Sequence, residues 1–199
     1  MTEESRLRCF KEELAWIKDE KIRRFTERAI AELPDYFFEV PASSTGKYHP
    51  SYALGLGGLL RHTKAAVAIA KDLLGLEMYG KFSDEVRDMI LSVLILHDGM
   101  KHGVNGSEYT VANHPVVIAD WLVDTMKINE RFEPEFVEFY LGAIKSHMGQ
   151  WNTDYKTKEE IMPKPVTAIE KFVHQCDYLA SRKYLEVNFS AINYDGDRV

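Results

Sequence analysis

Apolar residues recur at helical intervals along most of this chain, and this spacing limits the fold more than any other feature. In the first segment the apolar positions are mostly three to five residues apart and end near Pro34, through Leu7, Phe10, Leu14, Ile17, Ile22, Phe25 and Ile30. Such intervals predict amphipathic helices, whereas strands would alternate apolar and polar residues. Because no convincing alternation occurs, we expect an all-α fold with helices packed around one core.

Five further helices are predicted after a long loop. Residues 41–58 hold Pro, Ser, Gly and Tyr without a clear period, which is typical of a loop. Helices are then expected over about 59–74 closed by Gly75, over 83–96, from 113–115 onward, over 134–147, and from beyond Pro163 and Pro165 to about Tyr184. Asn113 is a good N-cap, and Thr157 followed by Lys-Glu-Glu resembles a capping box that would start a short extra turn.

Length, charge and cysteine content limit the class of protein. The 199 residues suit one domain, and 45% hydrophobic residues allow a sizeable core. The formal net charge of −6 does not favour a broad nucleic-acid-binding surface. Cys9 and Cys176 form no CxxC pattern, which fits a reducing compartment. Because the N-terminus lacks an apolar leader and no apolar run approaches about 18 residues, we expect a cytoplasmic protein with no membrane partner.

Histidine and aspartate residues occupy successive helical segments. His62 lies in the second predicted helix, His97 and Asp98 end the third, His114 opens the fourth, His147 closes the fifth, and Asp177 lies in the sixth. Imidazole and carboxylate are ligands that Zn, Fe and Mn accept, and metal sites in helical bundles are built from facing helices. A single histidine near an apolar face is more often structural, and spacing alone does not bring the five segments together.

The motifs GGLLRHT (57–63) and HDGMKHG (97–103), with the later His114, His147 and Asp177, resemble the HD superfamily of metal-dependent phosphohydrolases. The order His, His-Asp, His, His, Asp matches its two-metal members, and the likeness covers roughly residues 41–182. Within the superfamily, PASSTGKYHP before GGLLRHT, and later SHMGQW and HQCDYLASR, are similar to the HD domain of bacterial 3′→5′ exoribonucleases. The resemblance implies an HD-domain helical bundle over 41–185, with an N-terminal helical segment over 1–40 packed on it and an irregular tail over 186–199.

The chain departs from the exoribonuclease group in three respects. Met148 stands where that group tends to have a second His, and Gly99-Met100 stands where Ile-Gly is commoner. No OB-like nucleic-acid module is expected ahead of the domain. Together with the acidic charge, these differences favour a small phosphorylated substrate or nucleotide over a nucleic acid.

The resemblance also implies a set of ligands. A first divalent metal ion would be held by His62, His97, Asp98 and Asp177, and a second by His114 and His147 with Asp98 as the bridge. Two cations about 3.5–4 Å apart can share a bridging water, lower its pKa and stabilise the attacking and leaving oxygens of phosphoryl transfer. Donors of this kind do not distinguish Fe, Mn, Zn, Ni, Co and Mg.

Asp98 and Lys101 are the expected catalytic residues. Lys101 lies three residues after Asp98, and if the helix continues that far it shares the same face. The resemblance implies that this lysine holds a phosphate oxygen as a point charge. A solvated lysine at a helix end is the alternative.

Three residues are candidates for substrate binding. His49 could reach the site from its loop or remain a surface histidine, and His102 could bind substrate or favour the dipole at a helix C-terminus. Trp151 could form a pocket wall, whereas Trp16 and Trp121 are expected in the core. His174 shares the direction of Asp177, three residues later, and we expect it to be a hydrogen-bonding core residue.

The function expected from these features is hydrolysis of a nucleotide or other phosphate ester by a metal-activated water. The same ligands serve in mixed-valence di-iron oxygenases of the superfamily, which is one alternative. A non-catalytic metal-binding module is another, although such a role would not need six metal-competent residues.

Overall fold

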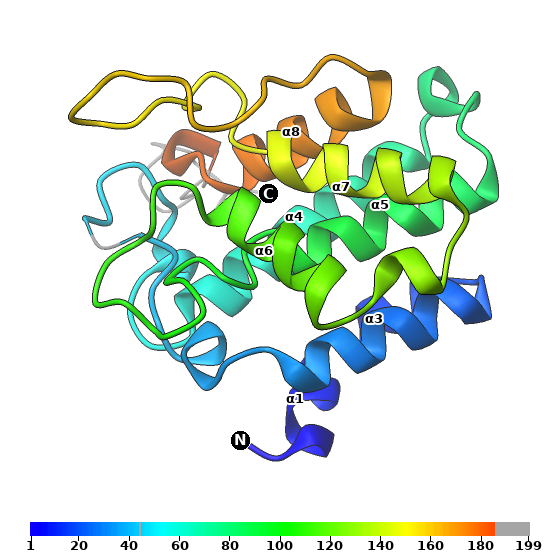
Figure 1. The fold of residues 1–199 in the computed structure, drawn as a ribbon, viewed down its shortest axis with the longest axis horizontal. Coiled ribbons are helices and arrows are strands. Elements are labelled where there is room, and N and C mark those ends of the chain that lie inside the picture. The colour runs from blue at the N-terminus through cyan, green and yellow to red at the C-terminus, as the bar shows by residue number, and fades with distance from the viewer. Residues whose placement is uncertain (44, 186–199) are drawn as a thin grey trace, which may run out of the picture.

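Amphipathic segments fold into helices throughout the computed structural model, which describes residues 1–43 and 45–185 (Figure 1). The α-helices are α1 (Glu3–Cys9), α2 (Lys11–Trp16), α3 (Glu20–Glu32), α4 (Gly58–Leu74), α5 (Asp84–Leu96), α6 (His114–Asp124), α7 (Pro134–Ser146) and α8 (Ala168–Ala180). The only β pairing in these two ranges is an isolated bridge between Thr153 and Glu160. The predicted all-α fold is therefore confirmed.

Helix α5 forms the centre of the bundle. Every residue from 88 to 100 is buried, so this helix is covered on all sides rather than along one stripe. It packs against α3, α4, α7 and α8, and Figure 1 shows α3 along one side of it and α7 and α8 along the other. A buried chain of hydroxyl groups, Thr26–Ser92–Tyr140, links α3, α5 and α7 through contacts of 2.6 and 2.7 Å.

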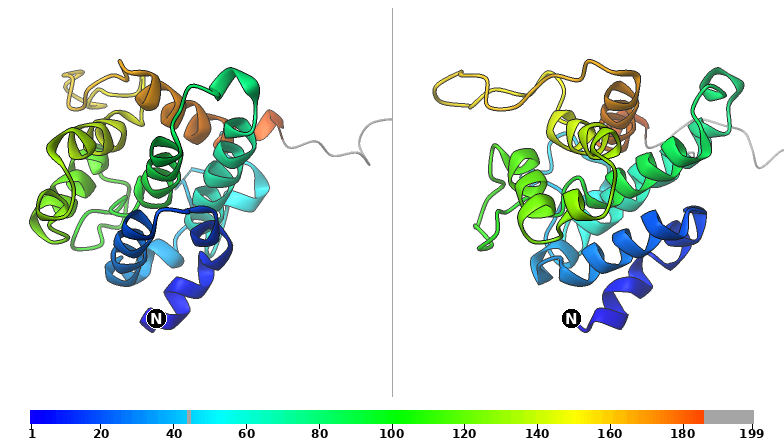
Figure 2. Two further views of the ribbon diagram at one scale, coloured as in Figure 1. Left: turned by 90° about the vertical axis from the view of Figure 1, so that its right-hand side faces the viewer. Right: turned by 45° about the vertical axis from the view of Figure 1, so that its right-hand side comes forward.

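The N-terminal segment is three helices instead of the single run that the apolar spacing suggested. The chain leaves α2 at Ile17 in an extended conformation, and Asp19 then caps α3 by accepting a hydrogen bond from the Ile22 N–H. Asp88 of α5 fixes this break because its carboxylate accepts hydrogen bonds from the backbone N–H groups of Lys18 and Asp19. Figure 2 shows α1 and α2 beside α3 at one edge of the bundle.

This N-terminal segment shares the core of the rest of the chain. Phe10 and Ile17 are fully buried in it, together with residues of all the later helices. The described part of the chain is one compact domain. The boundary between residues 40 and 41 stays a prediction, and the predicted tail over 186–199 lies outside the described residues.

Two predictions in the C-terminal half were wrong. Helix α8 begins at Ala168, where Thr167 and Glu170 form a reciprocal capping box, and ends at Ala180 well short of Tyr184. The Thr157 segment starts no helical turn, because the Asp154 carboxylate accepts the N–H groups of Lys156 and Thr157 and closes a surface turn. The true capping box therefore lies ten residues beyond the one that the sequence pattern suggested.

Two caps differ from their expected chemistry. Asn113 occupies the N-cap position of α6 without a side-chain hydrogen bond, and Gly75 ends α4 with a right-handed backbone at φ −74°. Within the two described ranges, no helix is both long enough and apolar enough to span a bilayer.

Long loops gather at one end of the bundle. The segments 45–57, 97–113 and 147–167 lie together at the left of Figure 1, beside the C-terminal ends of α5 and α7 and the start of α6. The second of these loops begins at His97 and ends directly before His114, and the third begins at His147. The fold thus brings the separated motifs to the same end of one core.

Candidate metal centre

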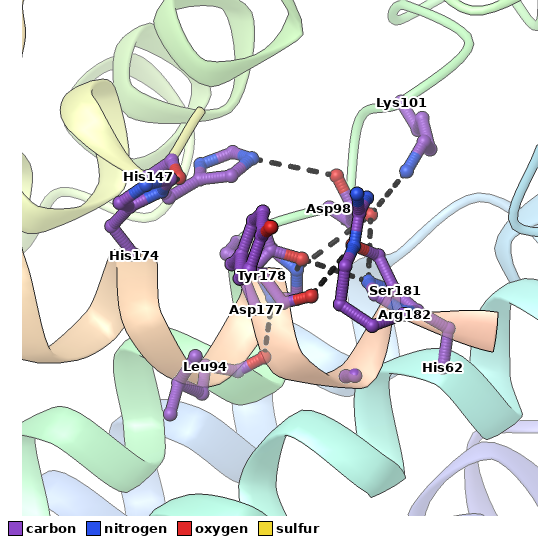
Figure 3. A network of polar contacts seen from close by, with 12 residues as sticks. His62, Leu94, Asp98, Lys101, His147, His174, Asp177, Tyr178, Ser181 and Arg182 are labelled. Carbon is purple, nitrogen blue, oxygen red and sulfur yellow. Dashed lines mark hydrogen bonds and ion pairs between the residues drawn. The ribbon is translucent and has the colours of Figure 1, made fainter. Parts of the chain in front are cut away.

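The six predicted ligands converge at the loop-bearing end of the bundle. Three overlapping groups each place their donor atoms within 4.8 Å of one another: His62–His97–Asp98, His97–His147–Asp177 and Asp98–His114–His147. All but Asp177 are buried, and Asp177 is half-buried. Figure 3 shows Asp98, His147, Asp177 and His62 facing a common space, with Asp177 on α8, His62 on α4, and Asp98 and His147 just beyond the ends of α5 and α7.

Asp98 lies in the middle of this cluster. Its Oδ1 is 3.0 Å from His114 Nε2 and 3.6 Å from His147 Nε2. Its Oδ2 is 3.6 Å from His97 Nε2 and 3.8 Å from His62 Nε2. One carboxylate oxygen therefore faces each half of the cluster, as a bridging ligand would require.

Asp177 completes the half that contains His62 and His97. Its Oδ1 is 3.0 Å from His62 Nε2 and 3.5 Å from His97 Nε2. This oxygen comes from α8 and the imidazoles from α4 and the end of α5, which pack against one another. Packing of three helices thus fixes this half of the cluster.

Hydrogen bonds fix the tautomers of three imidazoles. The Nδ1 atoms of His97, His114 and His147 lie 2.7, 2.9 and 2.7 Å from the backbone carbonyls of Leu94, Val111 and Ile144. A carbonyl only accepts hydrogen bonds, so each Nδ1 carries the proton and each neutral ring has its Nε2 lone pair directed into the cluster.

The positions of His97 and His147 explain part of this geometry. Each residue directly follows the last residue of a helix, α5 or α7. The carbonyls of the last helical turn have no intrahelical partner, so they are free to accept a hydrogen bond from an imidazole at the C-cap. A histidine at a helix C-cap is therefore a local signal for a ligand of fixed tautomer.

The two carboxylates are strongly held in their charged form. Burial alone would raise the pKa of Asp98, but the charges of Lys101 and His97 outweigh it, and the close contacts of this carboxylate with the His114 and His147 rings act in the same direction, so this pKa lies well below its usual range. Burial opposes ionisation of Asp177 too, and its close contacts with the His62 and His97 imidazoles hold its pKa well below the ordinary value. Both groups are therefore anions at neutral pH.

The pKa values of His97 and His114 shift in opposite directions within the same cluster. Burial disfavours the charged form of His97, but the adjacent Asp98 and Asp177 carboxylates outweigh this effect and raise its pKa. Burial dominates at His114 and lowers its pKa, despite its contact with Asp98. A metal ion therefore competes with a proton more strongly at His97 than at His114.

The cluster contains polar atoms that the protein leaves without a hydrogen-bond partner. Among the described residues, these include His97 Nε2, Asp98 Oδ1 and His62 Nδ1, all buried. Lone pairs of His114 and His147 also face each other, with their Nε2 atoms 3.3 Å apart. Acceptors directed at acceptors in a dry site are unfavourable unless a cation lies between them.

These donors fit a divalent metal ion. Nitrogen and oxygen ligands about 2.0–2.2 Å from a metal lie roughly 3.0–3.5 Å from one another, close to the separations in this cluster. Imidazole and carboxylate suit Zn, Fe, Mn, Co and Ni alike, so the donor set does not select one metal. The three carbonyl contacts supply the outer support that metal-binding histidines ordinarily have.

Lys101 reaches the cluster by a different route from the one expected. Helix α5 ends at Leu96, so Lys101 is not on a helical face shared with Asp98. A turn closed by the Lys101 N–H and the Asp98 carbonyl brings the side chain back, and its Nζ lies 2.5 Å from Asp98 Oδ2. Figure 3 shows the ammonium group directed at this carboxylate.

His49 is brought to the edge of the cluster. Its ring centroid is 5.4 Å from that of His62, and the side chain is half-buried. Burial lowers the pKa of His49 to about 4, with the nearby His62 and Lys101 acting in the same direction against Asp177 and Asp98. His49 is therefore neutral at neutral pH and is not a surface histidine.

His102 takes a structural position outside the cluster. Its Nδ1 donates to the Ser107 carbonyl at 2.7 Å, and its ring stacks on Tyr36 with centroids 5.3 Å apart. It lies six residues beyond the end of α5, which rules out the alternative of a helix C-terminal dipole, and its binding of substrate stays a prediction. These contacts fix the loop that follows the HDGMKHG motif.

His174 positions the backbone of His147 and is not itself a member of the cluster. Its Nδ1 donates to the His147 carbonyl at 2.7 Å, and Gly149 lies against its ring so closely that an added Cβ would come within 2.2 Å of Cε1. Gly149 also has a φ of +61°, which favours glycine. His174 is thus a half-buried hydrogen-bonding residue that positions the His147 backbone.

Trp151 lies beside the cluster with a partly exposed ring. It stacks on Tyr178, and Arg182 lies over both rings. Sequence reasoning pointed to Trp151 and missed Tyr48, Tyr178 and Arg182, although Tyr48 and Tyr178 directly adjoin His49 and Asp177 in the sequence.

The fold and the site together define an all-α protein with a buried His/Asp cluster that could hold metal. Comparison of the chain with protein-family models, with curated proteins and with solved structures gave no match.

Proposed function

We propose that this chain is a metal-dependent phosphohydrolase or phosphodiesterase of the HD type, acting on a nucleotide or other small phosphate ester. The observation that supports this proposal most is the arrangement around Asp98, whose two oxygens face two separate groups of imidazole Nε2 atoms. A mononuclear structural site would not need a carboxylate directed to both sides.

Each residue has a role in this proposal. His62, His97, Asp98 and Asp177 would hold one metal ion, and Asp98, His114 and His147 a second. When bound, two divalent ions would supply a water of lowered pKa and stabilise charge on the phosphate oxygens. The aspartates would partly neutralise the ions, and the carbonyl-bonded imidazoles would keep their lone pairs directed inward.

Lys101 and His49 would act on the substrate. Lys101 contributes an ammonium group at the cluster with 12% of its side chain exposed, so a phosphate oxygen could accept from it in addition to Asp98. His49 is neutral with an unpartnered Nδ1, so it would hold a substrate oxygen by a hydrogen bond and not by charge.

The test is the Asp98→Asn variant, which keeps the shape of the side chain and removes its charge. Native protein loaded separately with Mn, Fe, Zn, Ni, Co and Mg would be assayed on bis(4-nitrophenyl) phosphate, nucleoside monophosphates and cyclic nucleotides. We expect a rate loss of more than about 100-fold in the variant, since even outer partners of metal ligands change affinity or activity by 10–100-fold.

The matched control is Asp88→Asn, a buried aspartate on α5 outside the cluster. An amide oxygen can still accept the backbone N–H groups at that position, so metal content and hydrolysis should be retained. Native-like hydrolysis by Asp98→Asn protein would contradict the proposal. Oxygen consumption by iron-loaded protein, with no hydrolysis of any phosphate ester, would favour the di-iron oxygenase alternative instead.

A further inference from the structure

Three aromatic side chains and one arginine form a partly exposed surface beside the candidate metal centre, which we call the aromatic rim: Tyr48, Trp151, Tyr178 and Arg182. The rings of Trp151 and Tyr178 are nearly parallel, at 12°, with centroids 5.7 Å apart. The Arg182 guanidinium carbon lies 4.4 Å from the centroid of Tyr178, 5.7 Å from that of Trp151 and 6.0 Å from that of Tyr48. The four side chains thus form one continuous stacked group.

The aromatic side chains of the rim are partly exposed to solvent, whereas those of core residues are buried. Trp151 is 44% exposed and Tyr48 57% exposed, and neither belongs to the hydrophobic core. Large aromatic rings on a surface indicate a binding site when they gather with polar groups, whereas single exposed apolar residues need no explanation. Because Trp151 is 44% exposed despite these neighbours, its indole retains surface for a further planar group.

Arg182 is held in place by hydrogen bonds to the neighbouring Ser181 hydroxyl. Its Nε and Nη2 donate to Ser181 Oγ at 3.1 and 2.7 Å, and the Ser181 hydroxyl donates in turn to the Tyr178 carbonyl at 2.8 Å. No carboxylate of the described residues forms an ion pair with Arg182. A guanidinium group that is fixed over aromatic rings and has further N–H donors is suited to a planar ligand that offers hydrogen-bond acceptors.

The rim is connected to the candidate metal centre by two adjacent residue pairs. Tyr178 follows Asp177 on α8, and Tyr48 precedes His49, whose ring lies against His62. The Lys183 N–H donates to the Tyr48 carbonyl at 2.8 Å and joins the loop to the end of α8. Figure 3 shows Tyr178 on the helix that carries Asp177, and Ser181 and Arg182 directly after the end of this helix.

His174 adds a third connection. Its ring is 6.3 Å from that of Trp151 and 6.1 Å from that of Tyr178, and its Nδ1 bonds the His147 carbonyl. A ligand on the rim would therefore lie beside both halves of the cluster. The rim is placed to hold the part of a substrate that adjoins a phosphate at the metal centre.

We propose that the aromatic rim binds the nucleobase of a nucleotide, with Trp151 as the stacking surface and Arg182 as a cation over the rings and a donor to the base. This inference rests on the proposed function for the position of the phosphate. Every base has a π face, so such a rim selects nucleotides over phosphate esters without a base and discriminates weakly among bases. Trp151 and Arg182 are specificity-determining residues in this account.

Adenosine monophosphate and ribose 5-phosphate are the matched probes, because they differ only in the base. Binding of each to metal-loaded protein would be measured by isothermal titration calorimetry. We expect the nucleotide to bind about tenfold tighter or more, the usual range for one stacked base. Trp151→Ala should abolish this advantage and leave ribose 5-phosphate binding unchanged, Arg182→Ala should reduce it, and Trp151→Phe should keep most of it.

Tyr155→Ala is the control, because Tyr155 lies on the same loop, is 84% exposed and has the Lys158 ammonium over its ring. It should leave the affinity ratio of the two probes unchanged. Equal affinities in the native protein would overturn the proposal. An equal loss for both probes in Trp151→Ala would also overturn it, since that result indicates a structural role in the loop.

A further measurement separates this proposal from the proposed function. Adenosine lacks a phosphate, so its binding should be lost in Trp151→Ala and retained in Asp98→Asn, and that pair of results supports the rim whether or not the centre hydrolyses phosphate esters. Adenosine binding that survives Trp151→Ala would overturn the rim. Equal affinities for adenosine and adenosine monophosphate would count against phosphate binding at the metal centre, but not against base binding at the aromatic rim.

Discussion

Residue by residue, the candidate centre depends on which nitrogen of each imidazole carries its proton. His97, His114 and His147 each use Nδ1–H on the carbonyl three residues earlier, which leaves Nε2 for a metal. The same contacts lock the ring orientation. A replacement by Asn or Gln at any of the three would keep a polar group but lose this fixed direction.

The pH dependence of protein stability tests whether His49 is buried at the edge of the centre. Its pKa falls from 6.5 to about 4 on folding, mainly because of burial. Between these pH values the unfolded state binds the additional proton, so the free energy of unfolding decreases as pH falls from 6.5 towards 4. We expect His49→Gln to flatten this part of the pH dependence of Tm in metal-free protein.

The difference in the pH dependence of Tm between native and His49→Gln protein separates the contribution of His49 from those of the other titrating groups. Circular dichroism melts at matched ionic strength across the same pH window would supply the measurement. Parallel curves for native and His49→Gln protein would show that His49 is solvated and does not lie against His62.

Much of the residue-scale site could be predicted from the sequence. The order of histidines and aspartates in the sequence predicted all six residues of the cluster, Asp98 included. The sequence did not show how they are held, because the carbonyl partners depend on where α5 and α7 end. The rim was missed for a similar reason: Trp151 and Arg182 are 31 positions apart and meet only through loop packing.

Among the helices, α8 contributes residues both to the candidate centre and to its surroundings. It carries Asp177, Tyr178 and the supporting His174, and it begins at a capping box that satisfies both the Glu170 N–H and the Thr167 N–H. Helix ends are where backbone donors lack partners, so the cap fixes where α8 starts. Its start in turn sets the position of its later residues.

Thr167→Ala should therefore destabilise the protein by about 1 kcal/mol, the usual cost of losing an N-cap side chain. For a chain of this size the loss corresponds to a fall in Tm of roughly 2–4 °C. Thr157→Ala is the matched control, because Thr157 is exposed and caps no helix. Equal melting temperatures for Thr167→Ala and native protein would contradict the role given to this capping box.

Element boundaries were predictable where their signals are local. Ser83 caps α5 at the expected place, and Pro134 opens α7. The break between α2 and α3 was missed because its partner, Asp88, is about 70 positions away in the sequence. The long apolar period continued through this break, so periodicity alone could not reveal it.

Across the whole molecule, the fold concentrates lone pairs and negative charge at one buried end. The core around α5 holds these groups together, although among the described residues several of them lack hydrogen-bond partners. A cation that binds only the folded state would relieve this repulsion. Metal binding should therefore raise the stability of the entire domain and not of one loop.

Thermal melts with and without metal test this coupling. At a free metal concentration of about 100 times Kd, the linkage adds roughly 2.7 kcal/mol to the free energy of unfolding. We expect Tm to rise by several degrees with a transition metal and to return to its starting value with a chelator. The Asp98→Asn variant should show a much smaller rise, and an equal rise in both proteins would place metal binding outside the cluster.

The number of metal ions per chain shows whether the His/Asp cluster forms a two-metal centre. Metal-free protein would be loaded anaerobically with Fe, Mn or Zn, freed of excess metal by gel filtration and measured by elemental analysis. The account predicts about two ions per chain in the native protein and about one in His114→Gln, which removes a ligand of one half only. Native protein that retains no metal, or a His114→Gln variant that still holds two ions, would contradict it.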